Sequence, residues 1–514
     1  MSSTATVPSG NRLETPTNSI DAISPPVRLD RRWPRRNHVL REGECTIAAR
    51  CGVSGPEDAL LFAPLTDVFG DDVVLEHFSE RSLVSVWLEV ERALAAAQVE
   101  CGVIPEAAAA AIDAAARPEA IDLQLLRERS RVVGYPILPL LEQVAAASPA
   151  AGMHVHWGAT TQDIMDTGLA LTAVRVLDRI GVLLAMLGDG VAGLANAHRR
   201  TVMAGRTHAQ PAVPITFGGK LAVMLAELTR HRERLRRARA TIGVVELFGA
   251  AGTAAALGAG SVEIRRAVAR RLELDVVDLP WHTARDGVTE AACAAAGLAA
   301  TCAKLGREVV ELSRPELGEV QEGGGRLRGA SSTMPQKANP IGSEATIGMA
   351  LVAAQQVGVL LSAMQAPHER AAGEWQAEWD AFALTLAAAG GAVARAGDVV
   401  RDLRVEAERM RANLLSDGGT IMAEAAMMAV AEVVGRAEAH DLVYDAAAEA
   451  RREGIMLRDA LERTLPADVL SALPPLADIL DPDGYLGETE REIDASLTAW
   501  HALTGAVEAE TAPP

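Results

Sequence analysis

Aromatic residues are scarce in this 514-residue chain, which has 7 Trp, 6 Phe and 3 Tyr. Apolar residues nevertheless make up 49% of the chain, so a large core is available. Ala and Leu supply much of this apolar content; both are good helix formers, and Ala allows helices to approach closely. The composition therefore favours packed helices over sheets and predicts an all-α fold.

Cysteine is also rare, and the spacing of the five cysteines is irregular. Neither a CxxC motif nor a Cys/His pair with metal-ligand spacing is present, so we expect no metal site. An odd number of scattered cysteines is typical of reduced thiols, and we expect a cytoplasmic protein without a disulfide framework. These residues are Cys45, Cys51, Cys101, Cys293 and Cys302.

Positive charge is in deficit, with 49 Lys and Arg against 68 Asp and Glu and a net charge of −19. Such a chain repels phosphate backbones, which argues against a nucleic-acid partner. A small anionic substrate would need a local cationic site. Residues 345–367 contain no charged side chain and could span a bilayer by length. Because this stretch contains three Gln and several small residues, we expect the centre of a helical bundle and no membrane partner.

The chain divides into four parts by composition. Residues 1–65 are rich in Ser, Thr, Pro and Arg, and we expect a dispensable, disordered extension. An N-terminal helical domain is predicted for 66–163, a central bundle for 164–405 and a small, Pro-punctuated C-terminal domain for 406–514. The central part shows five long helical patterns separated by Gly-rich breaks. Their predicted bounds are 164–199, 212–242, 288–321, 340–366 and 376–403.

A Gly-rich loop carries the strongest chemical signal. Its glycines, from Gly323 to Gly329, are typical of a mobile segment. Ser331 and Ser332 follow with adjacent hydroxyls, and Lys337 adds a cation. Asn339 then precedes a Pro, a favourable helix start with Asn as N-cap. A loop that ends at a positive helix terminus is a natural carboxylate site.

Two further segments place polar groups next to long apolar helices. Trp157-Gly-Ala-Thr160-Thr161-Gln-Asp163 places two hydroxyls at a helix start, which fits either an N-cap or a carboxylate site. Gly205-Arg-Thr-His208-Ala-Gln210 places a lone His before another helix.

These three segments resemble the signature segments of the fumarase/aspartase superfamily, the class II fumarase, argininosuccinate and adenylosuccinate lyases. The match follows the family order over roughly residues 75–500. One departure is Ala330, which stands where the family motif has Gly before the Ser pair. Three other strings resemble the 3-carboxy-cis,cis-muconate cycloisomerase branch: Pro280-Trp-His-Thr-Ala-Arg-Asp286, His368-Glu-Arg-Ala-Ala-Gly-Glu-Trp375 with Trp379, and Leu480-Asp-Pro-Asp-Gly-Tyr-Leu-Gly487.

The resemblance implies a three-domain all-α fold whose central five-helix bundle forms a twenty-helix core in a homotetramer. Each active site would combine residues of three subunits, without a metal or organic cofactor. In this interpretation Ser331 is the catalytic base, Lys337 and Asn339 hold a doubly charged aci-carboxylate, and His208 orients the substrate or assists the leaving group. The remaining expected substrate contacts are Thr160, Thr161, Gln210, Ser332, Arg81 and Arg285.

Two departures from the branch bear on the substrate. Ala338 and Gly287 stand where Arg is common, so positive charge is missing near the expected site. A substituted succinate needs less positive charge than a tricarboxylate. The sequence therefore favours an anti β-elimination that yields fumarate, with nitrosuccinate as the named candidate substrate. The alternative is a cycloisomerase acting on 3-carboxy-cis,cis-muconate, and the third interpretation is a non-catalytic structural member of the superfamily.

Overall fold

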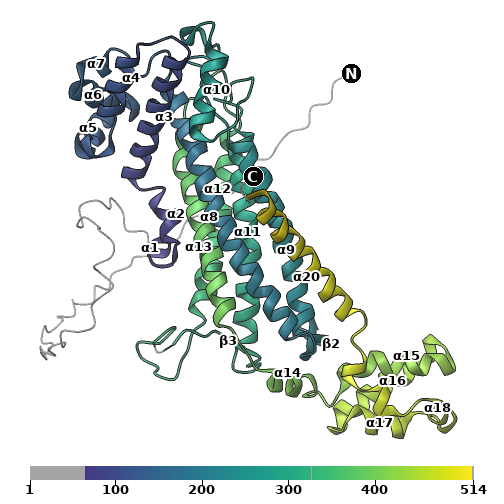
Figure 1. Cartoon of the computed structure of the whole chain (residues 1–514). Coiled ribbons are helices and arrows are strands. Elements are labelled where there is room, and N and C mark those ends of the chain that lie inside the picture. Colours follow the sequence, from purple (N-terminus) through teal and green to yellow (C-terminus); the bar gives the residue numbers. More distant parts are fainter. Residues whose placement is uncertain (1–63, 326, 512–514) are drawn as a thin grey trace, which may run out of the picture. The chain divides into compact units, whose positions relative to one another are not determined.

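The computed structural model describes residues 64–325 and 327–511, with side chains up to residue 502. The expected N-terminal extension lies almost wholly outside the described residues. Residues 62–514 form one compact unit. Helices dominate the described part of this unit, as the all-α prediction requires (Figure 1).

The N-terminal helices pack around the long helix α3, whose buried positions recur at helical spacing from Val84 to Gln98. Ser79 caps α3 by accepting a hydrogen bond from the Ser82 amide at 3.2 Å. Short helices follow on one side, and α10 packs on α3 from the centre of the chain. The elements are α1 (Pro64–Phe69), α2 (Asp72–Glu76), α3 (Glu80–Glu100), α4 (Glu106–Ala115), η1 (Pro118–Ala120), α5 (Leu123–Val133), α6 (Ile137–Ala147), α7 (Pro149–Gly152), η2 (Ala255–Leu257) and α10 (Ser261–Leu272).

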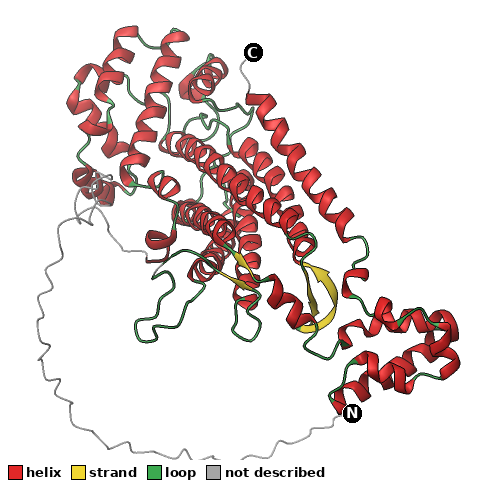
Figure 2. Cartoon of the chain, turned by 60° about the horizontal axis from the view of Figure 1, so that its bottom comes forward, coloured by secondary structure: helices red, strands yellow, loops and turns green. Residues whose placement is uncertain are grey.

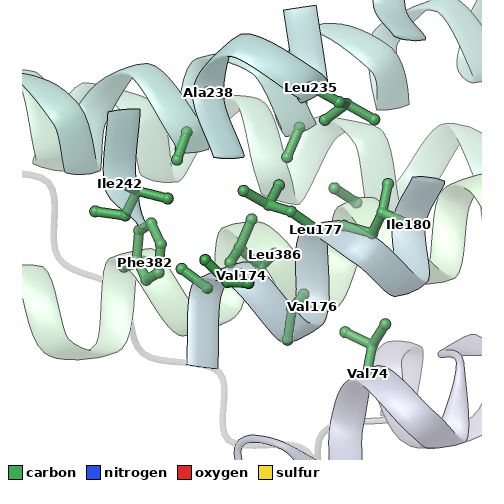
Figure 3. Packing of buried hydrophobic residues seen from close by; sticks show 14 of the residues in the cluster. Val74, Val174, Val176, Leu177, Ile180, Leu235, Ala238, Ile242, Phe382 and Leu386 are labelled. Atoms are coloured by element: carbon green, nitrogen blue, oxygen red, sulfur yellow. The ribbon is translucent and has the colours of Figure 1, made fainter. Parts of the chain in front are cut away.

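Five long helices form the central bundle, which confirms the predicted number of helices (Figure 1). Buried side chains of α8, α9 and α13 point toward one another, with Leu177, Ala238 and Leu386 among them (Figure 3). Many of these positions are Ala, which lets the helices lie close together. The five helices are α8 (Thr161–Ala197), α9 (Phe217–Ile242), α11 (Asp286–Leu312), α12 (Ile341–Ala363) and α13 (Glu374–Asp402).

Two small antiparallel sheets were not predicted. The second predicted helix was expected to begin at residue 212, but β1 (Val202–Thr207) and β2 (Gln210–Thr216) form a hairpin before α9. Pro211 and Pro214 lack the amide N–H that a continuing helix needs, so this helix begins only at Phe217. The second sheet pairs β3 (Val320–Gln321) with β4 (Arg404–Val405). Figure 2 shows both sheets, in yellow, among the helices.

A second hydrophobic core lies in the C-terminal part, and Val202 and Ala204 of the β1–β2 hairpin belong to it. The last helix, α20 (Thr489–Thr511), does not join this core but packs along α8 and α9 of the bundle. Helix α20 was expected in the C-terminal domain of residues 406–514, but it packs on the central bundle. The other elements are α14 (Ala407–Leu414), η3 (Thr420–Met422), α15 (Ala423–Val434), α16 (Arg436–Glu453), α17 (Leu457–Thr464), α18 (Ala467–Ala472), α19 (Leu476–Ile479) and η4 (Pro482–Gly484).

Three helices are long and apolar enough to cross a membrane by length and composition, namely α11, α12 and α13. The apolar windows of α11 and α13 are 61% and 72% buried inside the chain, but that of α12 is only 33% buried. Leu351 and Leu361 are among the exposed side chains of α12. Helix α12 is therefore apolar on a face that the described part of the chain does not cover.

The contact between α20 and α8 depends on a glycine at position 188, which leaves room for a Trp ring. Gly188 of α8 faces the buried Trp500 ring, and an added Cβ would lie 2.0 Å from it. We expect Gly188→Ala to destabilise the protein by about 1–3 kcal/mol, because overpacking forces the ring or the helix to move. Thermal unfolding, followed by circular dichroism, measures the change.

Gly181, on the same helix, provides the control because an added Cβ there meets no atom within 4 Å. Gly181→Ala should be neutral or stabilising by up to about 1 kcal/mol, the helix-propensity difference. Equal melting temperatures for the two variants would contradict the packing argument.

Candidate functional site

The signature loop surrounds the Ser331 hydroxyl with amide donors. Ser331 Oγ accepts hydrogen bonds from the backbone N–H of Thr333 at 3.3 Å and of Met334 at 3.1 Å. Two aligned donors favour a negative charge on this oxygen. Ser332 and Lys337 are exposed beside it, and the Lys337 ammonium bonds to no group among the described residues. The loop therefore presents an activated hydroxyl and a free cation.

A single carboxylate closes the base of this loop. Glu322 Oε1 accepts from the Gly342 amide at 2.8 Å and from Arg328, and Glu322 Oε2 accepts from Ser343. Glu322 thus satisfies the first amides of α12 and neutralises the positive helix end. Asn339 is not the N-cap, contrary to expectation: its side-chain amide donates to Gly329 O at 3.0 Å. In this conformation the helix terminus holds an internal carboxylate instead of a substrate.

His208 lies at the tip of the β1–β2 hairpin. It is exposed, with Ala209 beside it, and both residues have positive φ angles, of 51° and 61°. Thr207 and Gln210 pair across the turn, so the turn has two central residues. Positive φ at both positions is the geometry of a tight hairpin turn that usually contains Gly or Asn. Strained backbone of this kind, holding an exposed His, is typical of functional sites.

The hairpin is tied to the segment that leads into the signature loop. Arg206 forms an ion pair with the fully buried Glu319 at 2.6 Å. Asn413 of α14 donates a further hydrogen bond to Glu319 at 2.8 Å. His208 and the start of the signature loop are therefore anchored at the same end of the bundle.

Helix α8 begins at Thr161 with Thr160 as its N-cap, three residues before the predicted start at residue 164, and Asp163 fixes the position of this turn. The fully buried Asp163 carboxylate accepts from the amides of Thr160, Phe248 and Gly249 at 3.0, 3.0 and 2.9 Å. It also lies 3.0 Å from Nε2 of the His282 ring. These contacts fasten three separate segments around the first turn of α8, so the threonine hydroxyls are held in place.

Arg370 is a cation at this site to which the sequence analysis gave no role. Its Nη1 donates to Thr160 Oγ1 at 3.3 Å, and its Nη2 donates to Ala250 O at 3.2 Å. Neither contact neutralises its charge. The preceding His368 has a positive φ of 59°, so this turn is strained as well. Arg370 thus places a positive charge beside the hydroxyl expected to bind a carboxylate. The available signal was the His-Glu-Arg string itself.

His156 is a second residue without a predicted role. Its Nδ1 lies 2.6 Å from Glu91 Oε1, and its amide also donates to this buried carboxylate. Burial lowers the pKa of His156. The charge of Glu91 and this hydrogen bond together raise it by more, so the pKa lies above its usual value. His156 lies four residues before Thr160. The long-range contact with Glu91 and a positive φ of 62° distinguish His156 from an ordinary loop His.

Arg285 was expected to contact the substrate, but its guanidinium group is fully bonded within the protein. All five of its N–H donors are used inside the protein, on Asp166, Glu378 and the carbonyl of Trp281. Burial lowers the pKa of Arg285, but the two carboxylates raise it above its usual value. The guanidinium is buried and has no donor left for a ligand, so Arg285 stabilises the core. Arg81 is exposed in the first turn of α3, where no described residue pairs with it.

One group of side chains has metal-ligand character. Asp163, Glu246 and His282 are buried and hold one ligand atom each within 4.8 Å of one another. Burial raises the pKa of Glu246 to about 9, so this acid is protonated near neutral pH. Asp163 already accepts three amides and contacts His282, and Glu246 Oε2 accepts from the Trp281 amide at 2.6 Å. Glu246 Oε1 lies 3.3 Å from His282 Nε2 and makes no hydrogen bond to the described residues.

The threonine pair and the His208 hairpin lie at opposite ends of α8. Thr160 and Thr161 begin α8, whereas the His208 hairpin follows its last turn. A straight helix of 37 residues is about 55 Å long. The signature loop starts at the hairpin end, through the Arg206–Glu319 ion pair. The described part of one chain therefore does not bring the threonines, His208 and Ser331 together.

Comparisons with known proteins identify the family of the chain. A family model described as Lyase matches residues 69–358, and a model described as Adenylosuccinate lyase C-terminus matches residues 419–495. A 3-carboxy-cis,cis-muconate cycloisomerase of Pseudomonas aeruginosa is 40% identical over 433 residues, covering 83% of this chain and 94% of that protein. A nitrosuccinate lyase of Streptomyces davaonensis is 38% identical over 435 residues, covering 82% and 91%.

Among solved structures, a fumarate lyase from Mesorhizobium sp. BNC1 matches with a TM-score of 0.78 and 41% identity, covering 84% of this chain and 98% of that one. The matched residues include the signature loop, the hairpin and the threonine pair. The chain is therefore an enzyme of the fumarase/aspartase superfamily, related to its 3-carboxy-cis,cis-muconate cycloisomerases.

Proposed function

We propose that this enzyme is a lyase that removes a group from a substituted succinate by anti β-elimination and releases fumarate. The observation that carries the proposal is the Ser331 oxygen, which accepts two backbone N–H bonds. An alkoxide held in this way takes a proton from the carbon beside a carboxylate. The electrons of that C–H bond pass into the carboxylate, giving the aci-carboxylate. They then form the C=C bond as the leaving group departs with its bonding electrons.

Charge stabilisation in this reaction falls to the exposed cations. The aci-carboxylate carries two negative charges, and Lys337 is the free ammonium six residues from Ser331. At the other end of the site, Thr160, Thr161 and Arg370 bind the second carboxylate. Asn339 supports the loop base through Gly329, and His208 with Gln210 faces the leaving group.

Missing positive charge favours a small dianion. Ala338 is exposed in the loop, and Gly287 is the second residue of α11, so neither position supplies a cation. Arg285, the remaining Arg of that segment, is fully neutralised within the core. Nitrosuccinate is our candidate substrate, with nitrite as a leaving group that departs as a stable anion. The nitrosuccinate lyase among the relatives supports this choice.

Lactone formation from 3-carboxy-cis,cis-muconate is the alternative. It adds a carboxylate to a double bond through the same aci-carboxylate, so the same residues serve it. The 40% identity to a cycloisomerase favours this reaction. The two reactions differ in their substrates and products, which makes the choice an experimental one.

We also propose that the enzyme assembles into a homotetramer, which the separation of the site residues supports. The ends of α8 lie about 55 Å apart, so a complete site needs the opposite ends of different chains. Exposed Leu351 and Leu361 on α12 provide an apolar surface for such packing. We therefore propose that α12 lies at the centre of a symmetric oligomer, in which each site draws on more than one subunit.

The catalytic role of Ser331 has a direct test. We expect Ser331→Ala to lower kcat by at least about a thousandfold, roughly 4 kcal/mol of barrier, with little change in melting temperature. The exposed hydroxyl makes no core contact. Ser332→Ala is the matched control and should mainly raise KM, because it removes a substrate contact but keeps the base. A Ser331→Ala variant within tenfold of wild-type kcat would rule out this base.

A substrate panel decides between the two reactions. We expect nitrosuccinate to yield equal amounts of fumarate and nitrite, measured by ultraviolet absorbance and a diazo colour reaction. Malate, aspartate, argininosuccinate and adenylosuccinate complete the lyase arm, and 3-carboxy-cis,cis-muconate forms the cycloisomerase arm. Lactone formation without any fumarate from the lyase substrates would replace our proposal with the alternative.

Shared sites predict complementation between inactive variants. Ser331→Ala and a Thr160→Val, Thr161→Val double variant are unfolded together, mixed equally and refolded. Random assembly gives about a quarter of the sites both wild-type segments, if these come from different chains. Activity should return to about that fraction. Each variant refolded alone is the control, and mixed tetramers that remain inactive would contradict the shared site.

A further inference from the structure

A cavity of about 340 Å³ lies between α3, α8 and α13, and aromatic rings line it. In a chain with 7 Trp and 6 Phe, the lining includes three Trp and two Phe. These rings are Phe78, Trp87, Trp375, Trp379 and Phe382. The proposed elimination uses none of them, so their concentration here needs another explanation.

The aromatic wall is rigid. Trp375 donates its Nε1 hydrogen to Asp166 Oδ1 at 3.2 Å and packs edge-on against Trp379, with ring centroids 5.1 Å apart. Tyr135 stacks on Trp375 from outside the cavity lining, at 6.0 Å between centroids. Rings held in this way offer fixed faces and edges to a ligand, at little entropic cost on binding.

Two buried polar atoms on residues of the lining have no partner among the described residues. Thr172 is 3% exposed, and its Oγ1 makes no hydrogen bond. The Nε1 atom of Trp379 is also buried and makes no hydrogen bond. Buried polar groups normally have partners, because an unpaired one loses its hydration without compensation. A ligand hydroxyl can accept from Trp379 Nε1, and it can donate to or accept from Thr172 Oγ1. A ligand that brings a hydroxyl into this cavity therefore supplies the kind of partner that each atom lacks.

Charge in the lining has one sign. Asp166 is neutralised by Arg285, but Asp380 is exposed and no described residue pairs with its carboxylate. The lining contains no Lys or Arg. An anionic substrate of the proposed elimination is therefore disfavoured here, and a cation is attracted both by Asp380 and by the ring faces.

We propose that this cavity binds a phenolic arylalkylammonium ion. Its hydroxyl lies inward on Thr172 and Trp379, its ring packs among the tryptophans, and its ammonium group lies outward at Asp380. Size, aromatic lining, unpaired buried polar atoms and charge all select this class. The proposal is independent of the elimination, since it concerns residues outside that site.

Calorimetric titration of the full-length protein tests the proposal, with tyramine as the probe. Phenethylamine lacks the hydroxyl, 4-ethylphenol lacks the ammonium, and 3-(4-hydroxyphenyl)propionate reverses the charge. We expect tyramine to bind at least about tenfold tighter than either phenethylamine or 4-ethylphenol. The propionate should not bind. Quenching of tryptophan emission, excited beyond tyramine absorption, should follow the same isotherm.

Two substitutions separate the two ends of the ligand. Asp380→Asn should lower the affinity for tyramine toward that for 4-ethylphenol, and Thr172→Val should reduce the advantage of tyramine over phenethylamine, because Trp379 Nε1 still bonds to the hydroxyl. Asp445→Asn, at an exposed Asp of α16, is the matched control and should change nothing. Absence of saturable binding, equal binding of tyramine and the propionate, or unaltered tyramine affinity in Asp380→Asn would each overturn the proposal. Melting temperatures verify that each variant is folded.

Discussion

The length of α8 is the constraint on which the rest of the structure depends. A helix of 37 residues has no internal hinge at which the chain turns back, so the segments at its two ends remain far apart. The threonine pair lies at the first turn and the His208 hairpin follows the last. The exposed apolar face of α12 then acquires a function in the assembly that we propose, where packing against other chains covers it and brings opposite ends together. In that proposal, catalysis and assembly depend on the same geometry.

The two ends of the bundle differ in rigidity. At the threonine end, Asp163 accepts three amides and Arg285 joins Asp166 to Glu378, all without solvent contact. Removing one partner from such a network leaves a buried charge uncompensated, which costs about 3–5 kcal/mol. At the loop end, Ser331 and Lys337 lie among exposed residues, and Glu322 fixes only the loop base. A fixed binding surface and a loop that is held only at its base suit the elimination that we propose, in which water is excluded after binding.

Sequence patterns predicted the parts of this structure that depend on local chemistry. The five long helices, the hydroxyl pair at the start of α8 and the loop with Ser331 and Lys337 follow from periodicity and motif. Hydrogen bonds and ion pairs between residues far apart in the sequence could not be predicted from these patterns. Glu322 replaces Asn339 as the group that caps α12, and the five donors of Arg285 end on distant carboxylates. The β1–β2 hairpin was missed because its prolines and apolar residues resemble the start of the next helix.

Charge selection at the site rests on a few uncompensated cations. The net charge of −19 is spread over the surface and screened within about 8 Å at physiological ionic strength, so it acts weakly on a bound molecule. Arg206, Arg285 and Arg328 each have a carboxylate partner and add little net attraction. Lys337 and Arg370 have no carboxylate partner among the described residues, and neither has Arg81. In the oligomer that we propose, Lys337 and Arg370 come from different subunits and face the two carboxylates of a succinate.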